Sequence, residues 1–249
     1  MKIIVCVKRV PDTGTRIRIG DDGRSIDPGG VKYVTNPYDE FATEAALRTR
    51  DEAGAGEVTA LAFGGEESQE VLRNALAVGA DRAVLLEGAA DMDGLATARA
   101  LASEVESADA DLVLLGVKAV DDDQQQVGPM LATLLGRPCA TQVSEFQVDE
   151  GTITARREVE GGVQTVRLPL PAVLTITKGV YEPRYASLKG IMAAKKKPLE
   201  VKEGLAVASR LAVESLELPP ERQGGRVVGE GPDAAAELVR LLREEANVL

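Results

Sequence analysis

The chain has 249 residues, enough for one large domain with an appendage. Its formal net charge is −11, and this acidic excess argues against nucleic-acid binding. It contains no histidine, which removes Ser-His and Cys-His catalytic pairs and histidine-ligated metal sites from consideration.

The first 135 or so residues alternate between short apolar runs and amphipathic segments. Asn36 and Pro37 indicate a helix start, because Asn is a favoured N-cap and Pro a favoured first helical residue. Within the polar stretch 13–30, alternation at Ile17 and Ile19 predicts a small hairpin. Buried strands are predicted at 2–7, 57–63, 83–86 and 112–115, and helices at 37–53, 72–79, 95–105 and 130–135. The alternation predicts an α/β fold with a doubly wound, mostly parallel sheet.

The stretch 112–130 carries the clearest indication of a site. An apolar strand ends at Gly116, a polar segment follows, and helical spacing resumes at Met130. Free backbone N–H groups and the helix dipole at such a helix start favour an anion, and a nucleotide phosphate is the obvious candidate. A solvated loop without a ligand is the alternative.

The pattern changes after residue 138. Period-two alternation over 142–178, with turns at 149–151 and 160–162, predicts antiparallel strands added to the sheet edge or set beside it. The stretch 202–233 is rich in Glu, Pro and Gly, and 234–245 reads as an amphipathic helix. We therefore predict an α/β nucleotide-binding domain at 1–198 and a C-terminal arm at 199–249 that packs on a partner.

Other features narrow the class further. Neither a dinucleotide-binding GxGxxG after the first strand nor a P-loop is present, so nucleotide binding without turnover is the better reading. Cys6 and Cys139 lack metal-ligand spacing and are interpreted as buried, inert thiols. No signal peptide or membrane span is apparent, which predicts the cytoplasm, or an organelle matrix after loss of a presequence.

Six segments, in order, resemble the β subunit of electron transfer flavoprotein over nearly the whole chain: VKRVPDT, GVKYVTNPYDEFATEAALR, ALAVGADRAVLL, LLGVKAVDDDQQQVGPM, EVEGGVQTVRLPLPAVLT and EPRYASLKGIMAAKKKP. The resemblance implies a heterodimer in which the α subunit makes most contacts to a redox-active FAD. The β subunit holds a buried AMP and completes the flavin pocket. Electrons then pass from acyl-CoA dehydrogenase-type donors to a membrane quinone oxidoreductase, with no bond-making by β-subunit side chains, so the chain is expected to be an electron carrier rather than an enzyme.

The resemblance also implies which residues bind the cofactors. We expect the backbone N–H groups around Gln125 to Val127 to hold the phosphate, and Asp121 or Asp123 to meet the ribose or cap the helix. Val127 replaces a Thr found in some members, which removes one hydroxyl. The implied set is Cys6, Asn36, Pro37, Tyr38, Asp39, Phe63, Gly116, Val117, Lys118, Ala119, Val120, Asp121, Asp122, Asp123, Gln124, Gln125, Gln126 and Val127.

A second implied site recognises the dehydrogenase. In the family, an exposed leucine on a recognition loop, here Leu188, docks into an apolar pocket of the donor. Its predicted supporting residues are Tyr185, Ile191, Met192, Lys195, Lys196 and Lys197, with the lysines forming a positive rim that steers an acidic partner.

Two further residues match positions near the flavin. Glu158 matches a carboxylate that helps to position the mobile FAD domain; an ordinary exposed strand residue is the alternative. Tyr38 matches an aromatic that approaches the flavin ring, while Thr13 replaces a second one.

Two other functions remain open from the sequence. In a bifurcating branch of the family, a second FAD replaces AMP and accepts a hydride from NADH. VPDT and QVGP favour that branch, whereas DDDQQQ and RYASLKGIM favour AMP-containing carriers. A free-standing nucleotide sensor of the universal-stress type shares the α/β layout but needs neither the lysine-flanked loop nor the arm.

Overall fold

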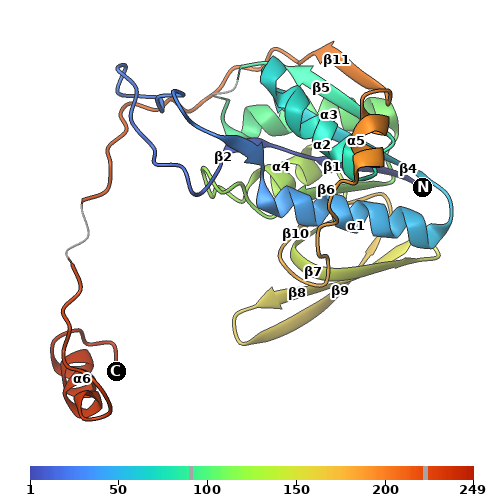
Figure 1. Ribbon diagram of the computed structural model, residues 1–249. Helices are drawn as coiled ribbons and strands as arrows, with labels where there is room; N and C mark the ends of the chain where they lie inside the picture. The colour runs from blue at the N-terminus through green and yellow to red at the C-terminus, as the bar shows by residue number, and fades with distance from the viewer. Residues whose placement is uncertain (90–91, 221–223) are drawn as a thin grey trace.

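A twisted nine-stranded sheet dominates the computed structural model, which describes residues 1–89, 92–220 and 224–249 (Figure 1). The strand order is β11-β5-β4-β1-β6-β10-β7-β8-β9, and the strands from β11 to β7 are all parallel. Their bounds are β1 (Lys2–Cys6), β4 (Glu57–Gly64), β5 (Arg82–Glu87), β6 (Leu112–Gly116), β7 (Cys139–Asp149), β8 (Thr152–Val159), β9 (Gly162–Pro169), β10 (Ala172–Ile176) and β11 (Leu199–Glu203).

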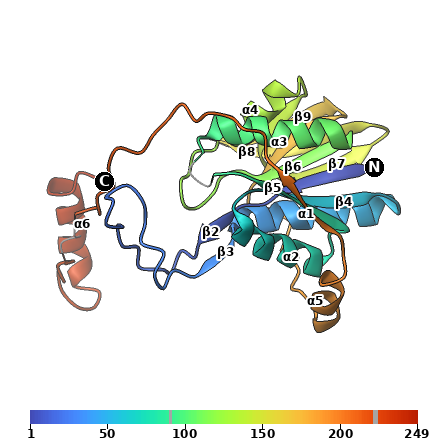
Figure 2. The same ribbon diagram turned by 90° about the horizontal axis from the view of Figure 1, so that it is seen from above.

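Helices cover both faces of the sheet, as Figure 2 shows. On one face Leu47 of α1 and Leu72 of α2 are fully buried, and on the other Leu101 of α3 and Leu131 of α4 are buried. Strands covered on both faces need apolar residues at every position, which explains their uninterrupted runs. The bounds are α1 (Pro37–Ala53), the 3₁₀ turn η1 (Glu66–Ser68), α2 (Gln69–Val78), α3 (Gly94–Ala108) and α4 (Val127–Leu134). The predicted doubly wound α/β fold is confirmed.

The strand order reverses beside β1. From β1 the chain moves outward through β4 to β5, and then returns through α3 to place β6 on the other side of β1. Loops after β1 and β6 therefore diverge to opposite faces and leave a crevice at the carboxyl ends of these strands. Open α/β sheets bind ligands at such a reversal.

The prediction of antiparallel strands over 142–178 is wrong for part of that stretch. β10 inserts between β6 and β7 and is parallel to both. Its five residues are all buried, as expected for a strand covered on both faces. β7 is long enough to pair with β10 through its first half and antiparallel with β8 through its second, so only β8 and β9 are purely antiparallel.

Several smaller elements differ from the sequence prediction. β11 completes the far edge of the sheet and lies beyond residue 198, where the predicted domain ends. β2 (Arg9–Pro11) pairs with β3 (Tyr33–Thr35), whereas the predicted hairpin within 13–30 amounts to one bridge between Ile19 and Ile26.

Two more helices lie near the C-terminus. The short α5 (Leu188–Ala194) packs on α2. The predicted C-terminal helix is observed as α6 (Ala234–Glu244), away from the sheet (Figure 1). No helix among the described residues combines the length and apolar character needed to cross a membrane.

Candidate functional site

A cavity of about 350 Å³ opens at the carboxyl ends of β1, β4 and β6, where the strand order reverses. Its walls come from strand ends, the start of α3, the loop before α4 and one residue of the arm. Residues predicted for the nucleotide pocket that line it are Cys6, Asn36, Asp39, Phe63, Gly116, Val117, Lys118, Ala119, Asp121, Asp122, Gln124, Gln125, Gln126 and Val127. The structure thus brings most of the predicted set to one place.

Four predicted residues lie outside this lining. Pro37 is the first residue of α1, and Val120 and Asp123 lie in the loop behind the cavity wall. Tyr38 is half-buried, with the Lys118 ammonium 5.8 Å from its ring centroid. Its predicted approach to a flavin stays a prediction.

Asn36 ties two loops together instead of capping α1 with its side chain. Its Nδ2 donates to the carbonyl of Lys118 at 2.8 Å, and its Oδ1 accepts from the N–H of Val120 at 3.2 Å. The predicted N-cap position of Asn36 and the helix start at Pro37 are confirmed, but the side-chain amide makes no capping bond because it is used to fix the loop after β6. Asn36 is 1% exposed, and its two bonds hold the loop after β6 against the start of α1.

Asp39 joins the ends of β1 and β6 from the first turn of α1. Its carboxylate accepts N–H bonds from Lys8 at 2.7 Å and from Gly116 at 3.0 Å. Burial raises the pKa of Asp39 to about 7, while these hydrogen bonds and the one from Asn36 act to lower it. Gly116 allows this close approach, since a Cβ there would collide with the Asp39 carboxylate.

Lysines neutralise the acidic part of the loop. Lys8 Nζ lies 2.9 Å from Asp121 and 3.0 Å from Asp122, and Lys118 Nζ lies 2.9 Å from Asp123. The expected ribose contact of Asp121 or Asp123 stays a prediction. The ion pairs hold the acidic triplet in place beside the cavity, and the sequence analysis missed this role of Lys8.

The start of α4 presents unused donors to the cavity. Within the described part of the chain, the N–H groups of Gln125, Gln126, Val127 and Gly128 donate to no protein acceptor. Gln125 has a φ of 56°, which turns the chain sharply into the helix. Converging N–H groups and the positive end of the helix dipole suit an anionic ligand such as a phosphate.

Asp93 connects the cavity to the C-terminal arm. One carboxylate oxygen caps α3 through the N–H of Ala96 at 2.8 Å, and the other accepts N–H bonds from Arg210 at 2.5 Å and Leu211 at 3.2 Å. These bonds hold the pKa of Asp93 down to about 2. Two residues further along, Val213 lines the cavity. Asp93 was not among the predicted site residues, although an Asp before a helix start is an N-cap pattern.

Four of the predicted recognition residues form an exposed apolar surface, with Tyr185 just before α5 and Leu188, Ile191 and Met192 on that helix. Tyr185 is 98% exposed, Leu188 85% and Met192 64%, with Ile191 also exposed. Leu188 is the first residue of α5, capped by Ser187 Oγ, so its predicted place on an irregular loop is wrong. A helical start gives the leucine a fixed direction that a loop would not.

Of the three predicted rim lysines, Lys197 points inward. Lys195 and Lys196 are exposed, whereas Lys197 Nζ donates to the carbonyls of Leu76 at 3.1 Å and Ala80 at 2.5 Å. Desolvation lowers the pKa of Lys197. Its charge therefore serves the C-terminal end of α2, where unpaired carbonyls attract a cation.

Contacts from α2 hold α5 in return. Arg73 Nη1 donates to the carbonyls of Ala194 at 2.7 Å and Lys197 at 3.0 Å, which satisfies the end of α5. Gly190 allows the two helices to touch, since a Cβ there would collide with the carbonyl of Ala77. These contacts fix α5, and with it the exposed Leu188, against α2.

Comparison with known proteins decides the family. A family model described as "Electron transfer flavoprotein domain" matches residues 25–205. The electron transfer flavoprotein subunit beta of Bradyrhizobium diazoefficiens is 41% identical, covering 100% of both chains, and that of Homo sapiens is 40% identical, covering 98% of each. The Bacillus subtilis subunit is 39% identical over 100% of both chains. The chain belongs to the electron transfer flavoprotein β-subunit family. The resemblance found in the sequence is confirmed.

Other predicted features of this family member are placed but not explained by the structure. Glu158 is exposed on β8 and pairs in register with Val163 of β9. Cys6 is buried and Cys139 half-buried, and burial raises the pKa of both thiols, which keeps them protonated. No cluster of metal-ligating side chains occurs among the described residues.

Proposed function

We propose that this chain is the β subunit of a heterodimeric electron carrier that binds AMP in the cavity beside β1 and β6. It completes the FAD site of an α subunit, docks acyl-CoA dehydrogenase-type donors, and sends electrons toward a membrane quinone oxidoreductase. Family membership and the free N–H groups from Gln125 to Gly128 support this proposal. The N–H groups are the observation that carries the nucleotide site, because they form an anion site at the strand-order reversal.

The cavity walls suit the two parts of an adenine nucleotide. Phe63 and Leu101 supply apolar surface for a base. The start of α4 supplies donors for a phosphate. AMP bound there adds stability by binding only the folded chain.

The redox chemistry comes from FAD when it is bound at the intersubunit site. The side chains of this chain bind and orient, and none forms a bond with a substrate. The absence of histidine and the raised thiol pKa values of Cys6 and Cys139 support a carrier role. The two free thiols also suit a reducing compartment, the cytoplasm or an organelle matrix.

The arm supports an obligate partner over a free-standing sensor. Leu211, Leu218 and Val227 are all more than half exposed although they are large and apolar. Such residues need a covering surface. We propose that the α subunit provides it.

The test is to co-express the chain with its α subunit, denature the purified heterodimer, and quantify the released nucleotides by chromatography. One FAD and one AMP per heterodimer would support the proposal. Two FAD and no AMP would reassign the cavity to the bifurcating branch, in which a second FAD oxidises NADH. Release of one FAD and no second nucleotide would refute nucleotide binding by this cavity.

A further inference from the structure

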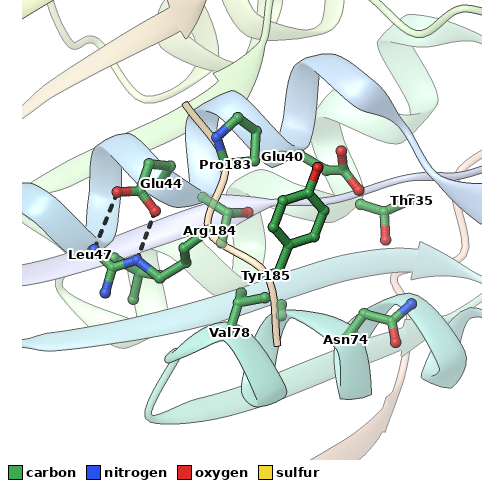
Figure 3. A pocket seen from close by; sticks show the side chains of 11 residues that line it. Thr35, Glu40, Glu44, Leu47, Asn74, Val78, Pro183, Arg184 and Tyr185 are labelled. Carbon is green, nitrogen blue, oxygen red and sulfur yellow. Dashed lines mark hydrogen bonds and ion pairs between the residues drawn. The ribbon is translucent and has the colours of Figure 1, made fainter. Parts of the chain in front are cut away.

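A second cavity, of about 190 Å³, lies between α1, α2 and the segment 183–185, away from the nucleotide cavity (Figure 3). Leu47, Ala75 and Val78 contribute apolar surface to it. Thr35, Glu40, Thr43 and Asn74 contribute oxygen acceptors. The cavity therefore combines an apolar floor with a polar wall.

The arginine at this cavity is already fully engaged. Arg184 makes a two-pronged ion pair with Glu44, at 2.7 and 3.1 Å, and reaches Asp51 at 3.4 Å. Figure 3 shows the pair of Glu44 with Arg184. Glu44 is 4% exposed and also accepts from Arg48 at 2.8 Å, so its charge is satisfied. This arrangement fixes the segment before α5 and leaves no free cation at the cavity among the described residues.

Glu40 is the carboxylate without a counterion there. No ion pair or hydrogen bond to its carboxylate is made by the described residues, and desolvation alone raises the pKa of Glu40. Tyr185 extends across the same cavity with its ring open to solvent (Figure 3). A carboxylate beside an exposed aromatic ring attracts a cation, through charge and through the ring face.

We propose that this cavity receives a lysine or arginine side chain of the dehydrogenase that docks on α5. The apolar stem of such a side chain would lie along Val78, and its charged head would reach Glu40 and the ring of Tyr185. The inference rests on the proposed docking function. Its position supports it, because Tyr185 precedes Leu188 by three residues, and a partner that covers α5 also covers the cavity mouth.

This contact gives the docking surface a direction. Lys195 and Lys196 place positive charge at the C-terminal end of α5. Glu40 of α1 places negative charge at the cavity that Tyr185 lines, near the N-terminal end of α5. A partner with acidic and basic groups in the matching order binds in one orientation only, since the reversed order would place like charges together.

The first test is Glu40→Gln in the purified heterodimer, assayed with an acyl-CoA dehydrogenase as electron donor. We expect the KM for the heterodimer to rise roughly three- to tenfold and its salt dependence to weaken. The kcat and the flavin content should not change, because Glu40 lies outside the nucleotide cavity. Glu106→Gln is the matched control, an exposed glutamate on α3 of the opposite sheet face, and should leave the KM unchanged.

A second variant fills the cavity from within. Asn74→Lys adds a cation of the chain itself to the lining that Asn74 shares with Glu40, so it should raise the KM as Glu40→Gln does. An unchanged KM in both variants would overturn the inference. If Leu188→Ala still raises the KM in that case, the proposed docking on α5 stands without the contact at this cavity. Weakened heterodimer assembly in Glu40→Gln, with an unchanged KM, would assign the cavity to the α subunit and also overturn it.

Discussion

The carboxylate of Asp39 and the backbone N–H of Gly116 are joined by a 3.0 Å hydrogen bond, which ties the first turn of α1 to the end of β6. The same carboxylate accepts the N–H of Lys8, at the end of β1. One side chain therefore joins the two strand ends at the strand-order reversal, beside the cavity that opens there.

Asp39→Asn should destabilise the chain by about 1–3 kcal/mol. An asparagine offers one carbonyl oxygen where two N–H groups need acceptors, and its NH₂ group would face the second donor. Urea unfolding of the heterodimer checks this value. The neighbouring Glu40→Gln is the control and should change the free energy of unfolding by less than about 0.5 kcal/mol. Equal stability of the two variants would show that the bridge contributes nothing.

The docking of the arm on Asp93 should depend on pH. The unfolded pKa of an Asp is about 3.9, and N–H bonds lower the pKa of Asp93 to about 2. Because the folded pKa is the lower one, its contribution is fully present above about pH 4 and is lost as the pH falls toward 2. The hydrogen-exchange protection factors of residues 205–215, which are corrected for the intrinsic pH dependence of exchange, should fall over that range.

Asp93→Asn should loosen the same segment at neutral pH. Asparagine has one acceptor oxygen where aspartate has two. If that oxygen keeps the cap of α3, the N–H groups of Arg210 and Leu211 lose their acceptor. Exchange at these residues should become roughly tenfold faster. Asp149→Asn, at an exposed strand end, should have no such effect. Unchanged protection in Asp93→Asn would mean that other contacts hold the arm.

Lys197→Met and Lys196→Met form a matched pair at adjacent positions. Lys197→Met removes a charged donor from the carbonyls of Leu76 and Ala80 and should cost about 1 kcal/mol of unfolding free energy. Lys196→Met should cost almost nothing, because that side chain is exposed. Thermal unfolding distinguishes them, and a larger loss in Lys196→Met would contradict the assignment.

Leu188→Ala should raise the KM for a dehydrogenase donor roughly tenfold and leave flavin content and the flavin spectrum unchanged. The side chain is 85% exposed and contributes little to the fold, so the loss falls on binding. Leu134→Ala, an exposed leucine of α4, should keep the parent KM. Equal electron-transfer rates in Leu188→Ala and the parent would remove the anchor from the proposal.

The sequence determined the features that depend on neighbouring residues. Continuous apolar runs gave the buried strands β1, β4 and β6, because a strand covered on both faces has no polar position. The polar break after Gly116 located the loop between β6 and α4, because the apolar run of the strand ends there. The ordered family motifs gave the family itself.

Only the tertiary structure decided which distant groups meet. Asn36 is the N-cap residue of α1 as predicted, but its side-chain amide bonds to a loop 82 residues away. Lys197 looked like a surface charge, but it bonds to carbonyls at the end of α2 and just after it. β10 reads as the next strand of a meander, yet it inserts between β6 and β7. The physical reason is common to all three. A side chain or strand takes the partner that best satisfies its buried polar groups and apolar surface, and the whole fold, rather than the local sequence, brings that partner within reach.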